Sequence, residues 1–294
     1  MNKIWSTYIQ TIGMLDRSRT LRFNESTKDL YTSRLGIDDK GALLEIGCGP
    51  GTLSGILGKW YPKLKIIGID RDVNFIEFAK KKYGNNGIEF FEDDATKLTF
   101  ENNRFDVTIS HTVSEHIDPD IFFKEQHRVL KNNGICIVLS SRARNAIDIK
   151  LDDRSEFEKN MFAKSEKYFK ETNEKYPVCQ FPLSEKELPE MLSKHGFKDI
   201  STDYLAINLT PDNYNTNKEL AIDIIKDQYQ SRIEMINYLY DILPDIYSIF
   251  SKDELNQWKT DIENKQKERL KKYEDGEKTW ETNVSIIMIV KGVK

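Results

Sequence analysis

Cysteine is scarce in this sequence: Cys48, Cys136 and Cys179 are its three cysteines among 294 residues, and no two of them form a CxxC pair. A disulfide framework or a structural zinc site needs several cysteines or histidines at short spacings. We therefore expect a protein that binds no metal and works in a reducing compartment.

Long apolar runs and a surplus of positive charge are also missing. The longest apolar run, Ile286–Val290, is far shorter than the roughly 20 residues that cross a bilayer. The first residues, MNKIWSTYIQ, lack the apolar stretch of a signal peptide, so a cytoplasmic protein without membrane contact is expected. The net charge is -4, and the longest basic run, Lys80–Lys82, suits a solvated helix end, so no nucleic-acid partner is expected.

From residue 42 to residue 140, short apolar runs alternate with amphipathic segments. The runs are Ala42–Ile46, Leu64–Ile69, Ile88–Phe91, Phe105–Ile109 and Ile135–Leu139. Buried parallel strands have this length and character. Helices are predicted at 51–60, 73–83 and 119–131, the last one stopped by the turn sequence KNNG. This alternation predicts an α/β fold with a doubly wound, mostly parallel sheet.

The sequence LLEIGCGPG joins the first predicted strand to the first predicted helix. Gly47, Gly49 and Gly51 allow the backbone to turn sharply and to approach a ligand without a Cβ in the way. The following helix directs free N–H groups and the positive end of its dipole toward the same place. Taken alone, however, the loop is also explained by a simple tight turn.

Three further predicted strands end in polar residues. Asp70 ends the second strand, where a carboxylate can accept hydrogen bonds from both hydroxyls of a ribose. Asp94 follows the third strand and could accept a hydrogen bond from an adenine amine, and Ser110 and His111 end the fourth. Because parallel strands end at one edge of a sheet, these groups predict a nucleoside-containing ligand in the crevice there.

The segments LLEIGCGPG, IIGID, FFEDDA, FDVTISHTVSEHI and RVLKNNGICIVLSS resemble the successive motifs of class I S-adenosylmethionine-dependent methyltransferases. They are most similar to the small-molecule branch that includes quinone-biosynthesis enzymes. The resemblance implies S-adenosylmethionine as cofactor and a Rossmann-like sheet whose last strand is antiparallel. A dinucleotide site is disfavoured, because the loop reads Gly-x-Gly-x-Gly and because Glu45 suits a cationic methionine amine better than a phosphate.

The resemblance also implies a role for each matching residue. The methionine part of the cofactor would lie against Glu45, Gly47, Cys48, Gly49 and Gly51, the ribose against Asp70, the adenine against Arg71, Asp94 and Ala95, and the sulfonium side against Ser110 and His111. The thiol of Cys48 is explained by packing and is not expected to act as a nucleophile.

Methyl transfer from a sulfonium needs mainly in-line positioning and exclusion of water. If the acceptor must lose a proton, His111 or His116 could serve as the general base. Alternatively, His111 is structural, and His116 and Glu115 orient the turn into the next helix. No Asn/Asp-Pro-Pro-Tyr/Phe motif follows the fourth strand and no Pro-Cys pair occurs, which argues against amine-modifying DNA and glutamine methyltransferases and against the cytosine-C5 type.

Several arginines could hold an anionic acceptor such as a carboxylate or phosphate. Arg142 and Arg144 follow the fifth strand, and Arg17, Arg19 and Arg22 stand in the N-terminal segment. Surface solvation is the simpler interpretation of each of them taken singly.

Strands at Lys198–Leu209 and Asn283–Val290 would complete a seven-strand core over residues 41–210 and 280–294, behind an N-terminal helical cap at 1–40. The connection 211–279 is far longer than the usual connection of about 4–6 residues. Its apolar residues recur at helical spacing, and a second helix is predicted from about Lys252 to Lys272. The residues with helical spacing are Ile222, Ile225, Tyr229, Ile233, Ile236 and Tyr240.

The predicted strand Lys198–Leu209 ends, and the predicted strand Asn283–Val290 begins, at the sheet edge that carries the predicted site. The insertion 211–279, which joins them, must therefore lie over the crevice. With residues 142–182 and the N-terminal cap, it is predicted to form a lid over an occluded acceptor pocket lined partly by aromatic side chains. A dimerisation arm is the alternative, and a homodimer is possible. The expected function is methyl transfer to a small molecule. Methylation of RNA or protein, and non-catalytic binding of the cofactor by a partner protein, are the alternatives.

Overall fold

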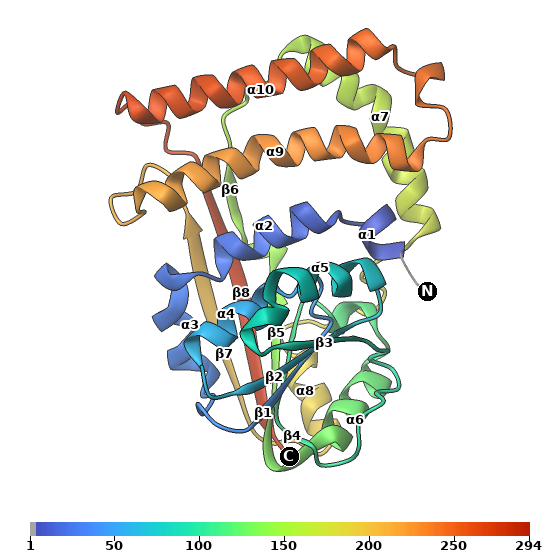
Figure 1. The fold of residues 1–294 in the computed structure, drawn as a ribbon, viewed down its shortest axis with the longest axis vertical. Helices are drawn as coiled ribbons and strands as arrows, with labels where there is room; N and C mark the ends of the chain where they lie inside the picture. Colours follow the sequence, from blue (N-terminus) through green and yellow to red (C-terminus); the bar gives the residue numbers. More distant parts are fainter. Residues whose placement is uncertain (1–3) are drawn as a thin grey trace.

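The structure is a computed structural model that describes residues 4–294, so the first three residues of the predicted N-terminal cap lie outside the described residues (Figure 1). Within this range, eight strands form one sheet in the order β3-β2-β1-β4-β5-β8, and β6 and β7 both pair with β8. The strands are β1 (Ala42–Ile46), β2 (Lys65–Asp70), β3 (Glu89–Glu92), β4 (Phe105–His111), β5 (Leu130–Ser141), β6 (Ile147–Ile149), β7 (Lys198–Leu209) and β8 (Thr282–Val293). The α-helices are α1 (Ile4–Tyr8), α2 (Ile12–Arg22), α3 (Lys28–Leu35), α4 (Thr52–Trp60), α5 (Val73–Tyr83), α6 (Pro119–Val129), α7 (Glu156–Lys175), α8 (Glu187–Lys194), α9 (Lys218–Ile242) and α10 (Lys252–Glu274).

The predicted doubly wound sheet with an antiparallel closing strand is confirmed. Each neighbouring pair among β1 to β5 is parallel, and β8 is antiparallel to both β5 and β7. The expectation of seven strands was wrong by one, because it missed β6. This three-residue strand pairs with Thr282–Val284, just beyond the part of β8 that pairs with β5. Its three residues are exposed and too few to give a periodic signal.

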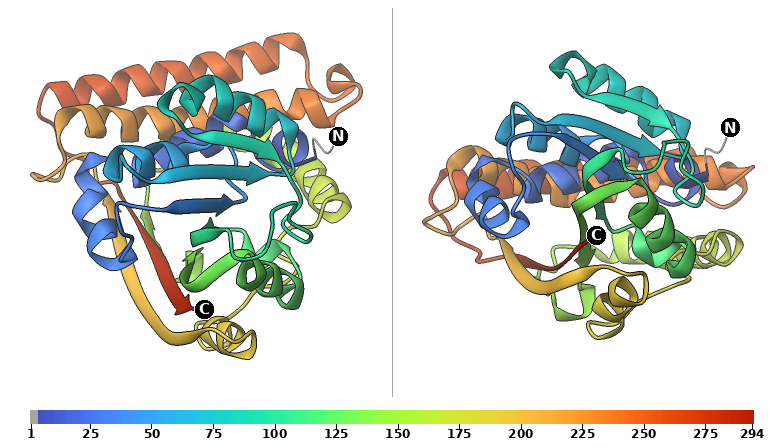
Figure 2. Two further views of the ribbon diagram at one scale, coloured as in Figure 1. Left: turned by 60° about the horizontal axis from the view of Figure 1, so that its bottom comes forward. Right: turned by 90° about the horizontal axis from the view of Figure 1, so that it is seen from below.

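Successive residues of a strand point to opposite faces of the sheet, and the central strands are apolar on both faces. Leu43 and Ile66 pack on the face covered by α3, α4 and α5. Leu44 and Ile67 pack on the opposite face with α6 and α8. Figure 2 shows this helix–sheet–helix arrangement from two further directions. The carboxyl ends of β1, β2, β3 and β4 therefore meet at one edge, which is where the predicted site residues lie.

The three helices predicted between the strands of residues 42–140 are confirmed, and the third of them ends earlier than predicted. The predictions at 51–60 and 73–83 correspond to α4 and α5. Helix α6 ends at Val129, two residues earlier than predicted, because Leu130 already pairs with Phe105 as the first residue of β5.

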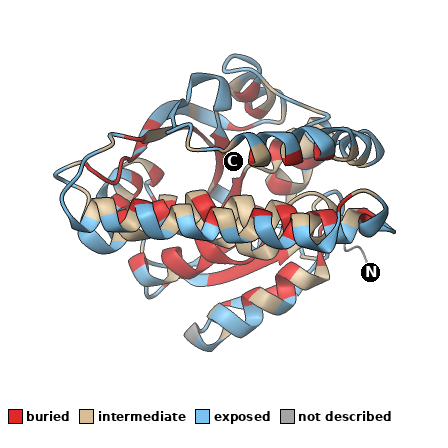
Figure 3. Cartoon of the chain, turned by 90° about the horizontal axis from the view of Figure 1, so that it is seen from above, coloured by how far each residue is buried: buried red, intermediate tan, exposed pale blue. Residues whose placement is uncertain are grey.

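Three long helices, α7, α9 and α10, form a separate layer beyond the sheet edge (Figure 1). The predicted helices of the insertion are confirmed as α9 and α10. They share a hydrophobic core of their own with α7, centred on Ile225, Ile236, Trp258 and Met161. Figure 3 shows buried residues alternating with exposed ones along these helices, as amphipathic packing requires.

Helix α7 was missed, because the sequence from 142 to 182 is charged and shows no strong period. A usable signal was present at its start: the hydroxyl of Ser155 accepts a hydrogen bond from the backbone N–H of Glu158, three residues later. Glu158 is fully buried and pairs with Arg232 of α9 and, at 2.8 Å, with Lys265 of α10. This carboxylate therefore joins all three helices of the layer.

Helices α1 and α2 lie between the sheet edge and α9 (Figure 1). Arg17 of α2 forms ion pairs with Asp227 at 3.0 Å and with Glu234 at 2.5 Å, both on α9. The hydroxyl of Tyr238 donates a hydrogen bond to the carbonyl of Tyr8. Among residues 4–294, no helix is both long and apolar enough to cross a membrane.

Candidate active site

The glycine loop after β1 has a backbone that side chains would obstruct. Gly47 has φ +68°, and a Cβ there would lie 2.4 Å from a methyl carbon of Val113. Gly51 has φ +79°, and a Cβ there would lie 2.8 Å from the Cβ of Ala79. Both positions therefore require glycine. Gly51 is needed for packing of the loop against α5 and β3, whereas Gly47 faces a cavity.

The acidic residues at the strand ends are held in fixed orientations. Asp70 accepts hydrogen bonds from the backbone N–H groups of Gly49 and Asp72, both at 2.9 Å. Burial raises the pKa of Asp70, while these two bonds oppose the shift. Asp94 accepts from the backbone N–H and the hydroxyl of Thr96, each at 2.8 Å. The two carboxylates are thus arranged at the ends of adjacent parallel strands.

A cavity of about 490 Å³ runs along this edge of the sheet. It brings together seven of the predicted site residues: Gly47, Gly49, Asp70, Arg71, Asp94, Ala95 and His116. Its size lies within the range of small-molecule and cofactor sites, about 300–1,000 Å³. Five other predicted residues do not line it: Glu45, Cys48, Gly51, Ser110 and His111.

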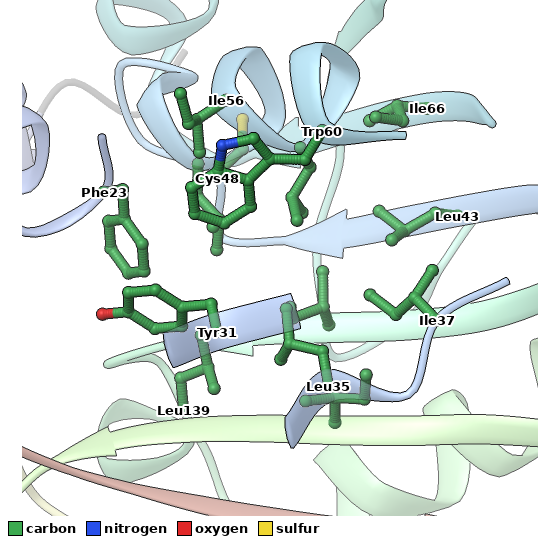
Figure 4. Close-up of a cluster of buried hydrophobic side chains, with 14 of the residues drawn as sticks. Phe23, Tyr31, Leu35, Ile37, Leu43, Cys48, Ile56, Trp60, Ile66 and Leu139 are labelled. Carbon is green, nitrogen blue, oxygen red and sulfur yellow. The ribbon is translucent and has the colours of Figure 1, made fainter. Parts of the chain in front are cut away.

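Two of these five lie behind the loop. Glu45 is fully buried and accepts a hydrogen bond from the hydroxyl of Ser54. Burial raises its pKa to about 7, although the nearby Arg19 opposes that shift. Cys48 directs its side chain into the hydrophobic core, where Figure 4 shows it beside Ile56 and Trp60. A nucleophilic role for this thiol is therefore not supported, as the sequence led us to expect.

Sequence reasoning weighed Arg19 for the acceptor but not for the cofactor. Its side chain extends from α2 over the glycine loop, where it donates to the carbonyls of Cys48 at 2.9 Å and His111 at 3.3 Å. The residue is only 4% exposed and lines the cavity beside Gly49. No described carboxylate lies within 4.0 Å of its guanidinium. A buried cation without a paired anion marks a place for an anionic group of a ligand.

Four buried polar atoms around the loop have no hydrogen-bond partner among the described residues: Arg19 Nε, Glu45 Oε1, Ser110 Oγ and His111 Nδ1. Native interiors pair nearly all such atoms, so unpaired ones call for an explanation. β1 and β4 bring them close together, since Ile46 pairs with Ser110. A cation beside unpaired carboxylate and hydroxyl oxygens fits the amino-acid end of S-adenosylmethionine. Asp70 and Asp94 fit its adenosine end.

The two histidines differ in their surroundings. His111 is buried, and its ring packs edge-on against Phe23 with ring centres 4.9 Å apart. Burial, with the positive charges of Arg19 and Arg22, lowers its pKa well below the ordinary value. The ring is therefore neutral at pH 7. His111 does not line the cavity at this edge of the sheet.

His116 lines the cavity of about 490 Å³, called the cofactor cavity from here on. Its Nδ1 already accepts a hydrogen bond from the backbone N–H of Cys179 at 3.0 Å. Burial and the neighbouring Arg71 lower its pKa to about 4. The hydrogen bond fixes the segment that brings Val178 and Phe181 to the cavity wall. A positioning role fits this geometry better than proton transfer does.

The N-terminal helix covers the other side of the cofactor cavity, whereas the sequence predicted an N-terminal cap over the acceptor pocket. The side chain and backbone N–H of Ser6 donate to Asp72, at 3.0 and 2.8 Å. The ring of Trp5 packs edge-on against the ring of His116. The guanidinium of Arg71 lies 6.0 Å from the centre of the Trp5 ring. Helix α1 therefore closes the cavity at the adenosine end.

A second, larger cavity of about 840 Å³ lies beneath the helical layer. Its floor is the end of the sheet at β6 and β8, and its roof is α9. Helix α2 separates the two cavities: Leu15 and Arg19 face the cofactor cavity, and Met14 and Arg22 face the larger one. The two linings share Ile9 and Gln10, just before α2.

Comparison with known proteins gives the same class. The family described as "Methyltransferase domain" matches residues 44–138. A demethylmenaquinone methyltransferase of Chlorobaculum tepidum is 32% identical over 198 residues, which cover 65% of this chain and 77% of that protein. A ubiquinone/menaquinone biosynthesis C-methyltransferase of Desulfotalea psychrophila is 26% identical over 142 residues, which cover 48% of this chain and 58% of that protein.

Among solved structures, the phosphoethanolamine N-methyltransferase 2 of Haemonchus contortus in complex with S-adenosyl-L-methionine has the same fold, with a TM-score of 0.54 and 19% identity. The match covers 99% of this chain and 59% of that one. The chain thus spans less than two thirds of the length of this methyltransferase and of the Desulfotalea relative. The chain belongs to the class I S-adenosylmethionine-dependent methyltransferases, in the branch of the quinone-biosynthesis enzymes. S-adenosylmethionine is the cofactor of this family.

Proposed function

We propose that this protein transfers a methyl group from S-adenosylmethionine to a small-molecule acceptor that binds in the cavity beneath the helical layer. The observation that carries the proposal is the pair of cavities that α2 lines together, with Arg19 facing one and Arg22 the other, and that meet at Ile9 and Gln10. One cavity has the groups that fit the donor. The other is large, partly aromatic and close enough to share residues with the first.

On the donor side, Asp70 would bind the ribose, and Arg71, Asp94 and Ala95 would surround the adenine. Gly47 and Gly49 would let the backbone approach the methionine part. We assign the methionine carboxylate to Arg19, since it is the buried cation of this cavity. Glu45, Cys48, Gly51, Ser110 and His111 would support the site from behind the loop, with Glu45 close enough to influence the charge of the methionine amine.

The bound cofactor supplies an activated methyl group, so the main tasks of the chain are orientation and exclusion of water. Helix α1 and the layer of α7, α9 and α10 would exclude water from the two sides. His111 is neutral, but it lines neither cavity and Phe23 packs against its ring, so it is assigned a supporting role behind the loop and not proton transfer. His116 is assigned a positioning role, since its Nδ1 is occupied.

The domain boundaries follow from the same proposal. Residues 41–210 and 280–294 form the catalytic core, and 211–279 forms the lid together with α7 and the N-terminal cap. A small acceptor is favoured over RNA by the net charge of -4, and also by the demethylmenaquinone methyltransferase among the relatives. Weak, sequence-independent RNA binding is therefore expected. A homodimer and a cytoplasmic location stay predictions.

A cavity-filling substitution tests the proposal. Ser231 lies on α9 in the roof of the larger cavity and does not line the cofactor cavity. Ser231→Trp should abolish methyl transfer, measured with cell extract and labelled donor, while calorimetry shows S-adenosylhomocysteine binding within a few-fold of wild type. Ser231→Ala is the matched control and should retain transfer.

Replacement of 212–278 by a short turn is the companion experiment, with the same expected outcome. Since this change also exposes the apolar face of α7, the variant must first show a cooperative thermal transition. Survival of transfer in both variants, with the deletion protein monomeric, would make the helical layer an assembly element and would refute the lid.

A further inference from the structure

The larger cavity contains many charged side chains, and its carboxylates are already paired. Five acidic residues line it, and each has a cationic partner. The pairs are Asp148 with Lys150 at 2.7 Å, Asp152 with Arg154 at 3.2 Å, Asp153 with Arg232 at 2.9 Å, Asp227 with Arg17 at 3.0 Å, and Glu281 with Arg269 at 3.3 Å. Among the described residues that line the cavity, every carboxylate therefore has a cationic partner.

Not every cationic residue that lines this cavity has a carboxylate partner among the described residues. Lys150, Arg154 and Arg232 are the partners of carboxylates in those pairs, but Arg22 is not. Among the described residues, no carboxylate oxygen lies within 4.0 Å of the Arg22 guanidinium. Its Nε donates to the hydroxyl of Ser285 at 2.9 Å, and its Nη1 to the carbonyl of Ser18 at 2.7 Å.

Nη1 also donates to the hydroxyl of Ser18 at 3.0 Å, and these three hydrogen bonds hold the side chain in place and leave Nη2 without a partner among the described residues. That nitrogen is not among the atoms buried from solvent without a partner, so it is accessible from the cavity. Burial lowers the pKa of the Arg22 guanidinium. A bound anion would oppose this lowering, because it stabilises the charged form. A guanidinium nitrogen that is free and has no carboxylate partner can donate a charge-assisted hydrogen bond to an anionic oxygen of a ligand.

Apolar groups complete the surroundings of Arg22. The cavity includes the rings of Phe162 and Phe169 from α7 and the side chain of Met235 from α9. Ile149 and Leu151 also line it and are 60% and 47% exposed, so the cavity opens to solvent at β6, where these two apolar side chains alternate with paired charges.

We propose that Arg22 binds the negatively charged group of the acceptor, which is therefore an organic acid with an apolar body. This inference rests on the proposed function, since it takes the larger cavity as the acceptor site. Helix α2 then contacts both reactants: Arg19 holds the carboxylate of the donor in one cavity, and Arg22, three residues later, holds the anion of the acceptor in the other. The acid would enter at β6, where Ile149 and Leu151 are exposed.

Binding of matched ligand pairs to the full-length protein saturated with S-adenosylhomocysteine tests this assignment. The probes are dodecanoate against methyl dodecanoate, and 4-phenylbenzoate against its methyl ester, measured by calorimetry. Wild type should bind at least one anion tenfold or more tightly than its neutral ester. Arg22→Met should remove that preference, and Arg22→Lys, which keeps the charge, should retain part of it.

Arg154→Met is the matched control, because Arg154 lines the same cavity but is paired with Asp152. Its anion preference should stay within twofold of wild type. No anion preference in wild type, or an unchanged preference in Arg22→Met, overturns the inference. If the ligands bind and Ser231→Trp blocks them, but without charge preference, only the role of Arg22 fails. If Ser231→Trp leaves both ligand binding and methyl transfer intact, the proposed acceptor cavity fails as well.

Discussion

Replacement of Arg19 by methionine should weaken cofactor binding while leaving the adenosine end of the site intact. The guanidinium is 4% exposed and already bonded to the carbonyls of Cys48 and His111, so it would meet the methionine carboxylate without reorganisation. A hydrogen bond between charged groups contributes about 1.5–3 kcal/mol. The expected loss of affinity for S-adenosylhomocysteine is therefore roughly 10- to 150-fold.

Isothermal titration calorimetry with two ligands separates this effect from a general loosening of α2. Methylthioadenosine has the same nucleoside but lacks the amino-acid group, so its affinity for Arg19→Met should stay within about threefold of wild type. Arg34→Met removes an arginine from an exposed ion pair with Asp203 and should change neither affinity. Equal losses for both ligands in Arg19→Met would refute a direct contact with the carboxylate, and so would unchanged binding of S-adenosylhomocysteine.

Three further predictions concern the cofactor edge and the buried ion pairs of Arg269. Asp70→Ala should weaken S-adenosylmethionine and S-adenosylhomocysteine alike, by about tenfold or more, because both ribose hydrogen bonds to a carboxylate are lost; an unchanged affinity in calorimetry would contradict the ribose assignment. Burial raises the pKa of Glu45 from 4.5 to about 7. Between pH 4.5 and about 7, the Glu45 carboxyl therefore keeps its proton in the folded protein and has lost it in the unfolded chain. The free energy of unfolding should consequently fall as the pH rises through this range. Glu45→Gln should remove about 3 kcal/mol of this fall. Urea titrations of wild type and Glu45→Gln at pH 5 and pH 8 check this prediction. The same difference in the free energy of unfolding between the two pH values in both proteins would be the contrary result. Arg269 is 3% exposed between Asp212 and Glu281, so Arg269→Met should destabilise the protein by about 3–5 kcal/mol by leaving two buried carboxylates without a cation; a change below 1 kcal/mol in urea unfolding would show that water reaches the pair.

The sequence was most informative where local pattern and tertiary position agree. The strands β1, β2 and β4 are five to seven residues long and buried, so their apolar runs mark both their extent and their place in the sheet. Their carboxyl ends are then fixed by parallel pairing, which is why Asp70 and Asp94 could be placed at one cavity from sequence. Helices α9 and α10 were found for a similar reason, since their apolar residues recur at helical spacing.

The features that were missed depend on contacts between distant parts of the chain. Ser6 bonds to Asp72, and Tyr238 bonds to Tyr8, so the place of α1 over the cofactor cavity is set by partners that no local pattern reveals. His111 was correctly located at the end of β4. However, only the structure shows that Phe23 covers its ring and that two arginines disfavour its protonation.

The role of α2 could not be predicted either. Arg17, Arg19 and Arg22 look alike in sequence, as three basic residues of one amphipathic segment. In the structure they point in three directions: Arg17 to α9, Arg19 to the glycine loop and Arg22 to the larger cavity. Since Arg19 and Arg22, three residues apart, lie on the same side of the helix, the distinction depends on what packs against each side chain.

Incubation of the protein with cell extract and methyl-deuterated S-adenosylmethionine, followed by mass spectrometry of separated small-molecule and macromolecule fractions, tests the central claim most directly. The proposed function predicts that wild type labels a small molecule, that Ser231→Ala labels the same one, that Asp70→Ala labels it more slowly at limiting donor, and that Ser231→Trp labels neither it nor any other. Label confined to RNA or protein, or no label in any fraction although the donor binds, would contradict methyl transfer to a small acceptor beneath the lid.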